Sequence, residues 1–148
     1  LAPFVEKVVS IDRSQPMLEA AKRRLQGHKN VQFQRGEIES LPLGAGSVDA
    51  AVSFLVLHHV DDPALAVEEM ARIVRTTKGG GLVLVVDMVR HDREHYRRTM
   101  GHKHLGFTES QIKDMFKAAG LTGVSFRELP GEPDARGPGL FVATGRKA

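Results

Sequence analysis

The chain of 148 residues contains no cysteine, and it has no apolar run long enough to cross a bilayer. Without thiols the protein can form neither disulfides nor thiolate metal sites. The longest apolar stretch, residues 50–57, is interrupted by Ser53, and it is far shorter than the roughly 20 residues that a membrane-spanning helix needs. No signal peptide is visible, so the sequence fits a cytoplasmic protein with no membrane partner.

A strong charge of one sign is also missing. The chain has 21 Lys and Arg against 18 Asp and Glu, a formal net charge of +3, and these residues are scattered along the sequence. Nucleic-acid-binding domains commonly carry a basic patch or stripe, so we do not expect a nucleic acid partner. The length and the 41% of hydrophobic residues predict one globular domain, residues 1–148, with its own core.

Glycine is absent from the start of the chain, where a strand runs directly into a helix. The β-branched residues 8–11 predict a strand, Ser14 is a good N-cap, and the first glycine, Gly27, ends the helix. A single carboxylate, Asp12, lies at the join. Because the chain begins with Leu1 and its first residues are typical of the end of a helix, we expect it to be an N-terminally truncated domain.

The rest of the sequence alternates between strands and helices. This alternation predicts a doubly wound α/β sheet, mostly parallel. The last two strands have no helix between them, so they should pair antiparallel and give the sheet an antiparallel C-terminal strand. Further strands are expected at residues 31–33, 48–57, 82–86, 124–129 and 140–144, and helices at 61–75, 91–104 and 108–119.

Polar residues follow several of these strands, at the edge of the sheet where open α/β folds bind ligands. Asp12, Glu37, residues 53–59 and Asp87 all lie at such strand ends. The two oxygens of Asp12 can accept hydrogen bonds from both hydroxyls of a ribose, or they can cap the helix that follows. Glu37, in the same position one strand over, favours the ligand, because its carboxylate can accept from an adenine amino group.

Three passages together resemble the class I S-adenosylmethionine-dependent methyltransferases: VVSIDRSQPMLEAAKRRL, VQFQRGEIESLPLGAGSVDAAVSFLVLHHV and ARIVRTTKGGGLVLVVD. The nearest group methylates small molecules such as quinones and sterols, and the resemblance covers nearly the whole chain. It implies a Rossmann-like methyltransferase fold, S-adenosylmethionine as cofactor, and methyl transfer to a small-molecule acceptor.

The resemblance also implies roles for individual residues. Asp12 would bind the ribose, the turn at residues 36–38 the adenine, and residues 53–59 the methionine part, while Asp49 matches the acid that opens the fourth strand. The residues expected to bind the cofactor are Asp12, Arg13, Gly36, Glu37, Ile38, Ser53, Phe54 and Leu55.

The sequence departs from the family pattern in three places. Glu37 replaces the usual aspartate, and the turn at residues 76–78 replaces the usual proline. The Gly-x-Gly-x-Gly turn, which lets the backbone approach the cofactor, should precede Asp12 and is absent. We therefore expect the first, central strand of the sheet to be missing from this sequence and to lie upstream.

Histidines supply the candidate catalytic and metal-binding groups. His58 and His59 follow the fourth strand and could take a proton from the acceptor as general base, or they could be structural. Methyl transfer needs mainly alignment, so a base is not required. His91 and His95 have the helical spacing of a zinc or nickel pair, with Asp92, His102 and His104 nearby, but a solvated polar helix is the favoured interpretation and no metal site is expected.

Two other functions remain open at this point. Residues 91–107, HDREHYRRTMGHKHLGF, resemble methyltransferase domains behind winged-helix regulators of the arsenic-repressor kind, so the chain could be a non-catalytic metabolite-sensing module. It could also be a truncated remnant without cofactor binding. The expected partner is a small-molecule methyl acceptor, whose identity the fold does not name, and a homodimer is left open.

Overall fold

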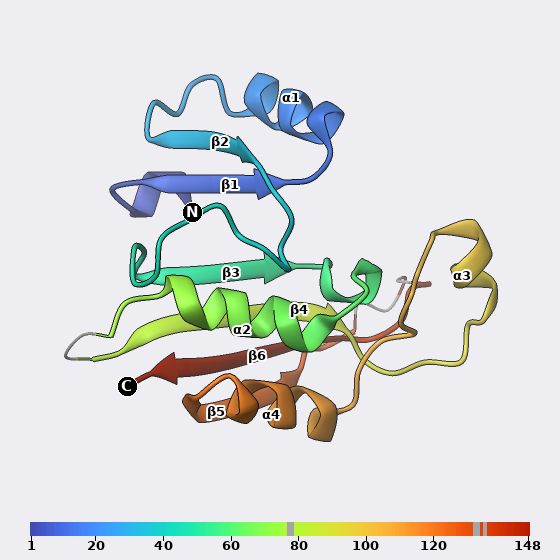
Figure 1. Ribbon diagram of the computed structural model, residues 1–148. Helices are drawn as coiled ribbons and strands as arrows, with labels where there is room; N and C mark the ends of the chain where they lie inside the picture. The colour runs from blue at the N-terminus through green and yellow to red at the C-terminus, as the bar shows by residue number, and fades with distance from the viewer. Residues whose placement is uncertain (77–78, 132–133, 135) are drawn as a thin grey trace. The chain divides into compact units, whose positions relative to one another are not determined.

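The computed structural model describes residues 1–76, 79–131, 134 and 136–148, and it is drawn in Figure 1. These residues form two compact units, residues 1–42 and 43–148. No helix among the described residues combines the length and apolarity needed to cross a membrane.

The first unit is a strand–helix–strand element. Its two strands pair in parallel, with Val8 opposite Val31 and Asp12 opposite Arg35. The hydroxyl of Ser14 caps the helix, as the sequence predicted, and Leu18 is the buried residue of that helix. The elements are β1 (Val8–Asp12), α1 (Gln15–Arg24) and β2 (Val31–Arg35), preceded by a 3₁₀ turn, η1 (Ala2–Phe4).

The second unit is a four-stranded sheet in the order β3-β4-β6-β5. β3 and β4 are parallel, whereas β6 runs antiparallel to both of its neighbours, which confirms the antiparallel C-terminal strand. The strands are β3 (Ala50–Phe54), β4 (Gly81–Met88), β5 (Leu121–Glu128) and β6 (Leu140–Lys147), and the helical elements are η2 (Leu57–His59), α2 (Pro63–Ile73), α3 (His95–Thr99) and α4 (Glu109–Ala118).

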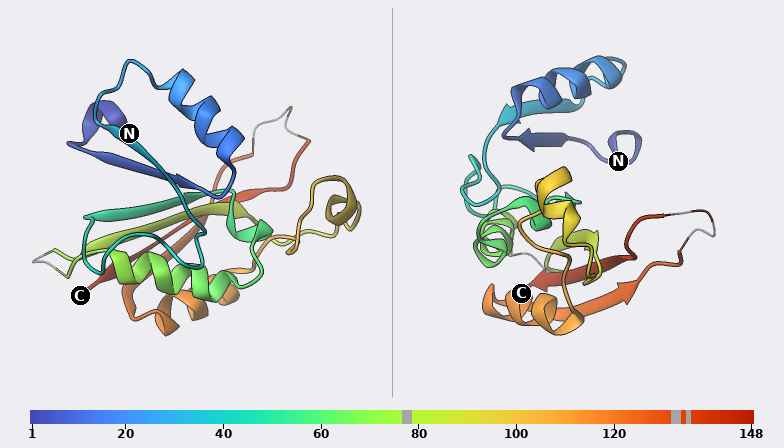
Figure 2. Two further views of the ribbon diagram at one scale, coloured as in Figure 1. Left: turned by 45° about the horizontal axis from the view of Figure 1, so that its top comes forward. Right: turned by 90° about the vertical axis from the view of Figure 1, so that its right-hand side faces the viewer.

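Helices α2 and α4 lie side by side on one face of this sheet (Figures 1 and 2). Asp62 caps α2, and Thr108 and Gln111 form a capping box at the start of α4. Every second residue of β4 is buried against these helices, as expected where one face of a strand is covered. The core of the unit therefore lies between the sheet and the α2–α4 layer, and it includes Val67, Met70, Val83, Val85, Ile112, Phe116 and Phe141.

Within the described part of the chain, strands β1 and β3 each have one edge without a strand partner. Among the described residues β1 pairs only with β2, and β3 pairs only with β4. Beside the open edge of β3, the side chains of Val52 and Phe54 are exposed to 37% and 57%. Unpaired edges with apolar neighbours are uncommon in folded sheets, because they invite pairing with another chain.

Two elements differ most from the sequence prediction, while the bounds of others, such as β5 and β6, shift by a few residues. Strand β3 ends at Phe54 rather than at residue 57, because the backbone of Leu55 turns to a positive φ. The helix expected over residues 91–104 is only α3, because the backbone N–H of His91 donates to the carbonyl of Leu105 instead of continuing a helix. Thr77 and Lys78, in the turn that departs from the family pattern, lie outside the described residues.

Candidate functional site

Asp12 ends β1 and holds the turn that leads into α1. Its Oδ1 accepts a hydrogen bond of 2.8 Å from the backbone N–H of Ser14, the N-cap of α1, so Asp12 supports the helix start without itself being the cap. The side chain is only partly buried, and its Oδ2 has no hydrogen-bond partner in the described part of the chain. One oxygen therefore holds the turn, and the other remains available to a ligand.

The turn after β2 lies next to Asp12. The backbone N–H of Gly36 donates to the carbonyl of Asp12 at 3.1 Å, and Nε of Arg35 donates to the carbonyl of Arg13 at 3.2 Å. A Cβ on Gly36 would come within 2.7 Å of the ring of Pro42, so only glycine fits there without rearrangement. The first unit thus brings Asp12, Arg13 and the turn at Gly36 together.

The acidic residue of this turn is accessible. Glu37 is exposed and Ile38 is partly buried, while the backbone N–H of Ser40 donates to the carbonyl of Glu37 at 3.2 Å and closes the turn. No hydrogen bond or ion pair holds the Glu37 carboxylate within the described residues. The carboxylate can therefore accept from a ligand.

In the second unit, the carboxyl end of β3 combines a buried hydroxyl with a strained residue. Ser53 is 4% exposed, and its Oγ has no hydrogen-bond partner among the described residues. Leu55 has φ 55°, while its N–H donates to the carbonyl of Val86 at 2.8 Å. Positive φ values at residues other than glycine are uncommon and cluster at functional sites. The expected residues Ser53, Phe54 and Leu55 thus form one unusual strand end.

Asp49, which also matched the family, lies at the opposite end of β3. Its carboxylate is exposed and pairs with Arg75 at 3.2 Å. Such a surface ion pair contributes little to stability and takes no part at the carboxyl ends of the strands.

His58 and Asp87 form a buried pair at the ends of β3 and β4. Their side chains are 2% and 0% exposed, and Nδ1 of His58 lies 2.7 Å from Oδ1 of Asp87. The same oxygen accepts from the backbone N–H of Met88 at 2.7 Å. The sequence analysis assigned both residues to this edge but did not foresee that they pair.

His59 and His102 complete a cluster around His58. The ring centroid of His58 lies 4.1 Å from that of His59 and 4.3 Å from that of His102. The loop that carries His102 is held in place because the backbone N–H groups of Lys103 and His104 both donate to the carbonyl of His58, at 2.9 and 3.1 Å. Sequence reasoning named His102 only as a neighbour of the His91–His95 pair and did not foresee its contact with His58.

Burial controls the ionisation of the histidines in this loop. Burial, with a smaller contribution from the neighbouring His58, His59 and His91, lowers the pKa of His102 to about 4. Burial and the neighbouring Arg93 also lower the pKa of His91. At neutral pH His102 is therefore an uncharged imidazole with a lone pair on one ring nitrogen.

His91 and His95 do not form the helical pair considered from their spacing. His91 precedes α3, and both rings pack on Tyr96, with centroids at 5.5 and 4.7 Å. His91 also lines a pocket of about 570 Å³ with Arg90, Asp92 and Glu94.

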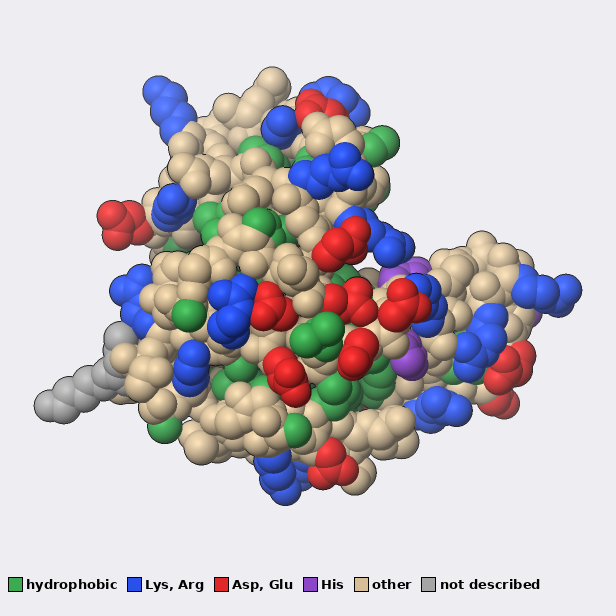
Figure 3. All heavy atoms as spheres, in the orientation of Figure 1, with side chains coloured by type: hydrophobic (Ala, Val, Ile, Leu, Met, Phe, Trp, Pro, Cys, Tyr) green, Lys and Arg blue, Asp and Glu red, His purple; other side chains and the backbone are tan. Residues whose placement is uncertain are grey.

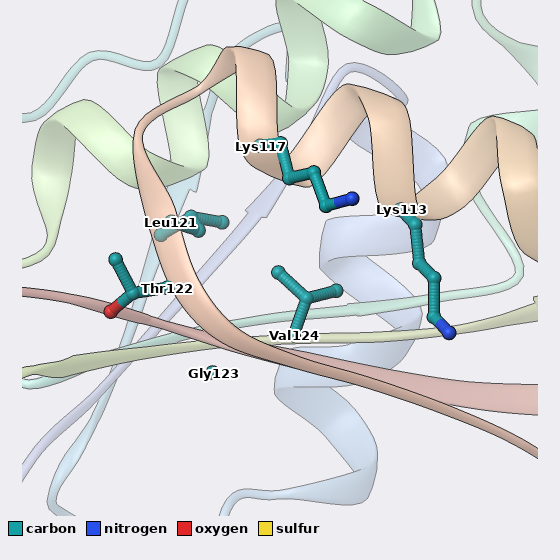
Figure 4. A pocket seen from close by; sticks show the side chains of 6 residues that line it. All are labelled: Lys113, Lys117, Leu121, Thr122, Gly123 and Val124. Carbon is teal, nitrogen blue, oxygen red and sulfur yellow. The ribbon is translucent and has the colours of Figure 1, made fainter.

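A second pocket lies between α4 and β5 (Figure 4), lined by Lys113, Lys117, Leu121, Thr122, Gly123 and Val124. It follows from the irregular register of β5 between Thr122 and Ser125, and its lining carries no acid or histidine. Basic and acidic side chains are interspersed on the face shown in Figure 3, as the scattered charges in the sequence predicted. Neither this pocket nor the mixed surface charge is as good a candidate for a catalytic site as the carboxyl ends of the strands.

Comparisons with known proteins identify the family. The methyltransferase domain family matches residues 1–85, more than half of the chain. The uncharacterized 37.1 kDa protein in transposon TN4556 of Streptomyces fradiae is 45% identical over 78 residues, covering 53% of this chain and 22% of the relative. The uncharacterized methyltransferase YcgJ of Bacillus subtilis is 36% identical over 88 residues, covering 58% and 34%. Demethylmenaquinone methyltransferase of Clavibacter sepedonicus is 32% identical over 87 residues, covering 59% and 34%.

The comparison with solved structures identifies the fold. The crystal structure of YcgJ from Bacillus subtilis superposes with a TM-score of 0.78 at 20% identity, covering 99% of this chain and 84% of that one. The chain spans between 22% and 34% of the length of the curated relatives described above. The Rossmann-like methyltransferase fold is thereby confirmed, and the chain belongs to the class I S-adenosylmethionine-dependent methyltransferases.

Proposed function

We propose that the protein transfers the methyl group of S-adenosylmethionine to a small-molecule acceptor in the cytoplasm. The observation that carries this proposal is the end of β1, where Asp12 keeps one carboxylate oxygen unpartnered beside the glycine turn that follows β2. In folds of this kind an acid in this position binds the ribose of a nucleotide cofactor. The compartment is proposed because a chain without cysteine has no need of an oxidising environment.

The residues present fit the cofactor. Asp12 and Glu37 offer acceptor oxygens for ribose hydroxyls and the adenine amino group. Ser53 adds a buried hydroxyl without a partner in the described residues, a group that gains from a polar ligand. We assign the adenosine contacts to Asp12, Arg13, Gly36, Glu37 and Ile38, and the methionine contacts to Ser53, Phe54 and Leu55.

The bound cofactor supplies an activated methyl group on a positively charged sulfur. Direct displacement then depends on how well the chain aligns the acceptor and excludes water. Of the two histidines considered as general base, His59 is partly exposed, whereas His58 is buried against Asp87. His59 is therefore the better candidate to reach an acceptor. Asp87 fixes the orientation of His58, which precedes His59 in the chain.

The acceptor is proposed to be a partly apolar molecule. Phe54, Leu55 and Val56 at the end of β3 are exposed to 57%, 43% and 37%, and exposed apolar side chains near a polar site commonly contact ligands. A quinone-like acceptor agrees with the name of the Clavibacter sepedonicus relative. No relative described above is named as a regulator, so the sensor and remnant alternatives have no support from the comparisons.

The test is a turnover assay on the full-length protein. It measures S-adenosylhomocysteine formed from S-adenosylmethionine in the presence of hydroquinones, phenols, thiols or amines. One acceptor class should give product above the background without acceptor. Tight binding of the cofactor with no turnover for any class would contradict the enzyme and leave a sensor.

The role of His59 is tested in the same assay. If His59 is the base, His59→Gln should lower kcat while leaving the affinity for S-adenosylmethionine unchanged, and the decline of the rate at acid pH should disappear. An unchanged pH–rate profile would show that alignment alone suffices.

A further inference from the structure

Three histidines from two separate segments meet in the second unit. His58 and His59 belong to η2, and His102 lies in the loop after α3. The centroids of His59 and His102 are 5.1 Å apart, and one ring nitrogen of each of the three lies within 4.8 Å of the others. Imidazole nitrogens gathered in this way are the usual ligands of zinc and of related divalent ions.

The outer contacts of two of these rings have the pattern found around metal ions. Nδ1 of His58 donates to the Asp87 carboxylate, because a carboxylate can only accept. Nδ1 of His59 lies 3.2 Å from the carbonyl oxygen of Gly101 and donates to it, because a carbonyl oxygen also can only accept. In the neutral form of each ring the lone pair is therefore on Nε2. Metal-binding histidines almost always donate their other N–H to a carboxylate or a backbone carbonyl.

The third ring, that of His102, lacks a hydrogen-bond partner for one of its nitrogens among the described residues. His102 is 5% exposed, and its Nδ1 has no hydrogen-bond partner within the part of the chain that the structure describes. Leaving a buried polar group without a partner is unfavourable, so the position of this ring nitrogen needs a reason. The two backbone hydrogen bonds from Lys103 and His104 to the His58 carbonyl fix this loop against η2. The cluster is thus held by the backbone as well as by its side chains.

We propose that His58, His59 and His102 bind a divalent transition-metal ion, with zinc as the preferred ion and Asp87 as the carboxylate behind His58. Zinc bonds nitrogen at about 2.0–2.1 Å, which places tetrahedral ligand nitrogens about 3.3 Å apart. The ring nitrogens, within 4.8 Å of one another, would have to move closer together to reach that distance. Three protein ligands leave one position of a tetrahedral ion open to water or another small molecule.

This proposal departs from the sequence analysis, which considered only His91 and His95 as a metal pair and favoured no metal. A bound ion occupies the His59 nitrogen that would take a proton, so His59 could act as a base only in the metal-free protein. Metal binding itself does not depend on methyl transfer, so it can be tested without cofactor or acceptor.

The experiment titrates Zn²⁺ and Co²⁺ into the full-length protein after removal of metals with a chelator. Calorimetry should give one Zn²⁺ bound by wild type, and Co²⁺ should give the visible absorption of a four-coordinate nitrogen site. Mg²⁺, which prefers oxygen ligands, should not compete. Asp87→Asn should weaken Zn²⁺ binding by about 10–100-fold, as for other carboxylates behind a ligating histidine.

The variants His59→Gln and His102→Gln should weaken Zn²⁺ binding more strongly and abolish the Co²⁺ absorption. His95→Gln is the matched control, because His95 is exposed and lies outside the cluster; it should bind like wild type. His59 is partly exposed, so the His59→Gln variant should fold. It therefore tests metal binding even if His102→Gln does not fold. The proposal is overturned if wild type binds no Zn²⁺ at micromolar concentrations, or if His59→Gln binds it as tightly as wild type.

Discussion

Nδ1 of His58 and Oδ1 of Asp87 lie 2.7 Å apart in the interior of the second unit, joining the ends of β3 and β4. Neither side chain reaches solvent, and Asp87 is the hydrogen-bond partner of the buried His58 ring, so the pair cannot be replaced by water. Asp87→Asn removes the charge and should lower the free energy of unfolding by about 2–3 kcal/mol. Urea unfolding measures this loss.

Asp49→Asn provides the control for that measurement. Its carboxylate is exposed and pairs with Arg75 at the surface, so this variant should stay within about 0.5 kcal/mol of wild type. Equal losses in the two variants would mean that the buried pair has no special role.

Asp12 should determine both cofactor affinity and the start of α1. Asp12→Ala removes the hydrogen bond from the Ser14 N–H and the proposed ribose contact, so it should cost about 1 kcal/mol of stability and weaken S-adenosylmethionine binding by roughly 10- to 150-fold. Asp12→Asn keeps an acceptor for this hydrogen bond and loses the charge. It should retain the stability of wild type and still bind more weakly. If Asp12→Asn binds like wild type, the ionised carboxylate does not hold the ribose.

Leu55 should carry backbone strain. Its φ of 55° costs a side-chain-bearing residue about 1–2 kcal/mol relative to glycine. Leu55→Gly should therefore keep or raise the thermal midpoint, although it removes a large side chain. Leu55→Val, with a β-branched side chain that avoids this region, should lower the midpoint. A higher midpoint for valine than for glycine would show that the backbone at this position is relaxed in solution.

Gly106 should be indispensable for the loop that carries His102. Its φ is +72°, and a Cβ there would overlap the carbonyl oxygens of Met88 and Val89. Gly106→Ala should therefore destabilise the second unit by more than the cost of φ alone. Gly101→Ala is the matched control, because Gly101 has φ +69° with open space around it, and it should cost only about 1 kcal/mol. Thermal melts of both variants test this difference, which vanishes if the loop can shift to accept a methyl group.

Local sequence patterns were sufficient for most of the fold. The β-branched residues of β1, the caps at Ser14 and Thr108, and the absence of a helix between β5 and β6 each determine structure within a few residues. The prediction for residues 91–104 was wrong because long-range pairing of His91 with Leu105 overrides their helical composition.

The candidate site was predictable only where its residues follow strands. Asp12 and Glu37 in the first unit, and Ser53 and Asp87 in the second, each follow a predicted strand, which is why sequence reasoning could name them as candidates. The contact between His102 and His58 could not be predicted in this way. More than forty residues separate the two in the sequence, and no local pattern encodes a contact over that separation.

The most direct test of the account is calorimetric titration of S-adenosylmethionine and S-adenosylhomocysteine into the full-length protein, with ATP as a control that shares the adenosine part. We predict that the first two ligands bind at one site per chain, compete with each other, and bind far more tightly than ATP. Heats of binding indistinguishable from dilution for both sulfur ligands would contradict the assignment of this site.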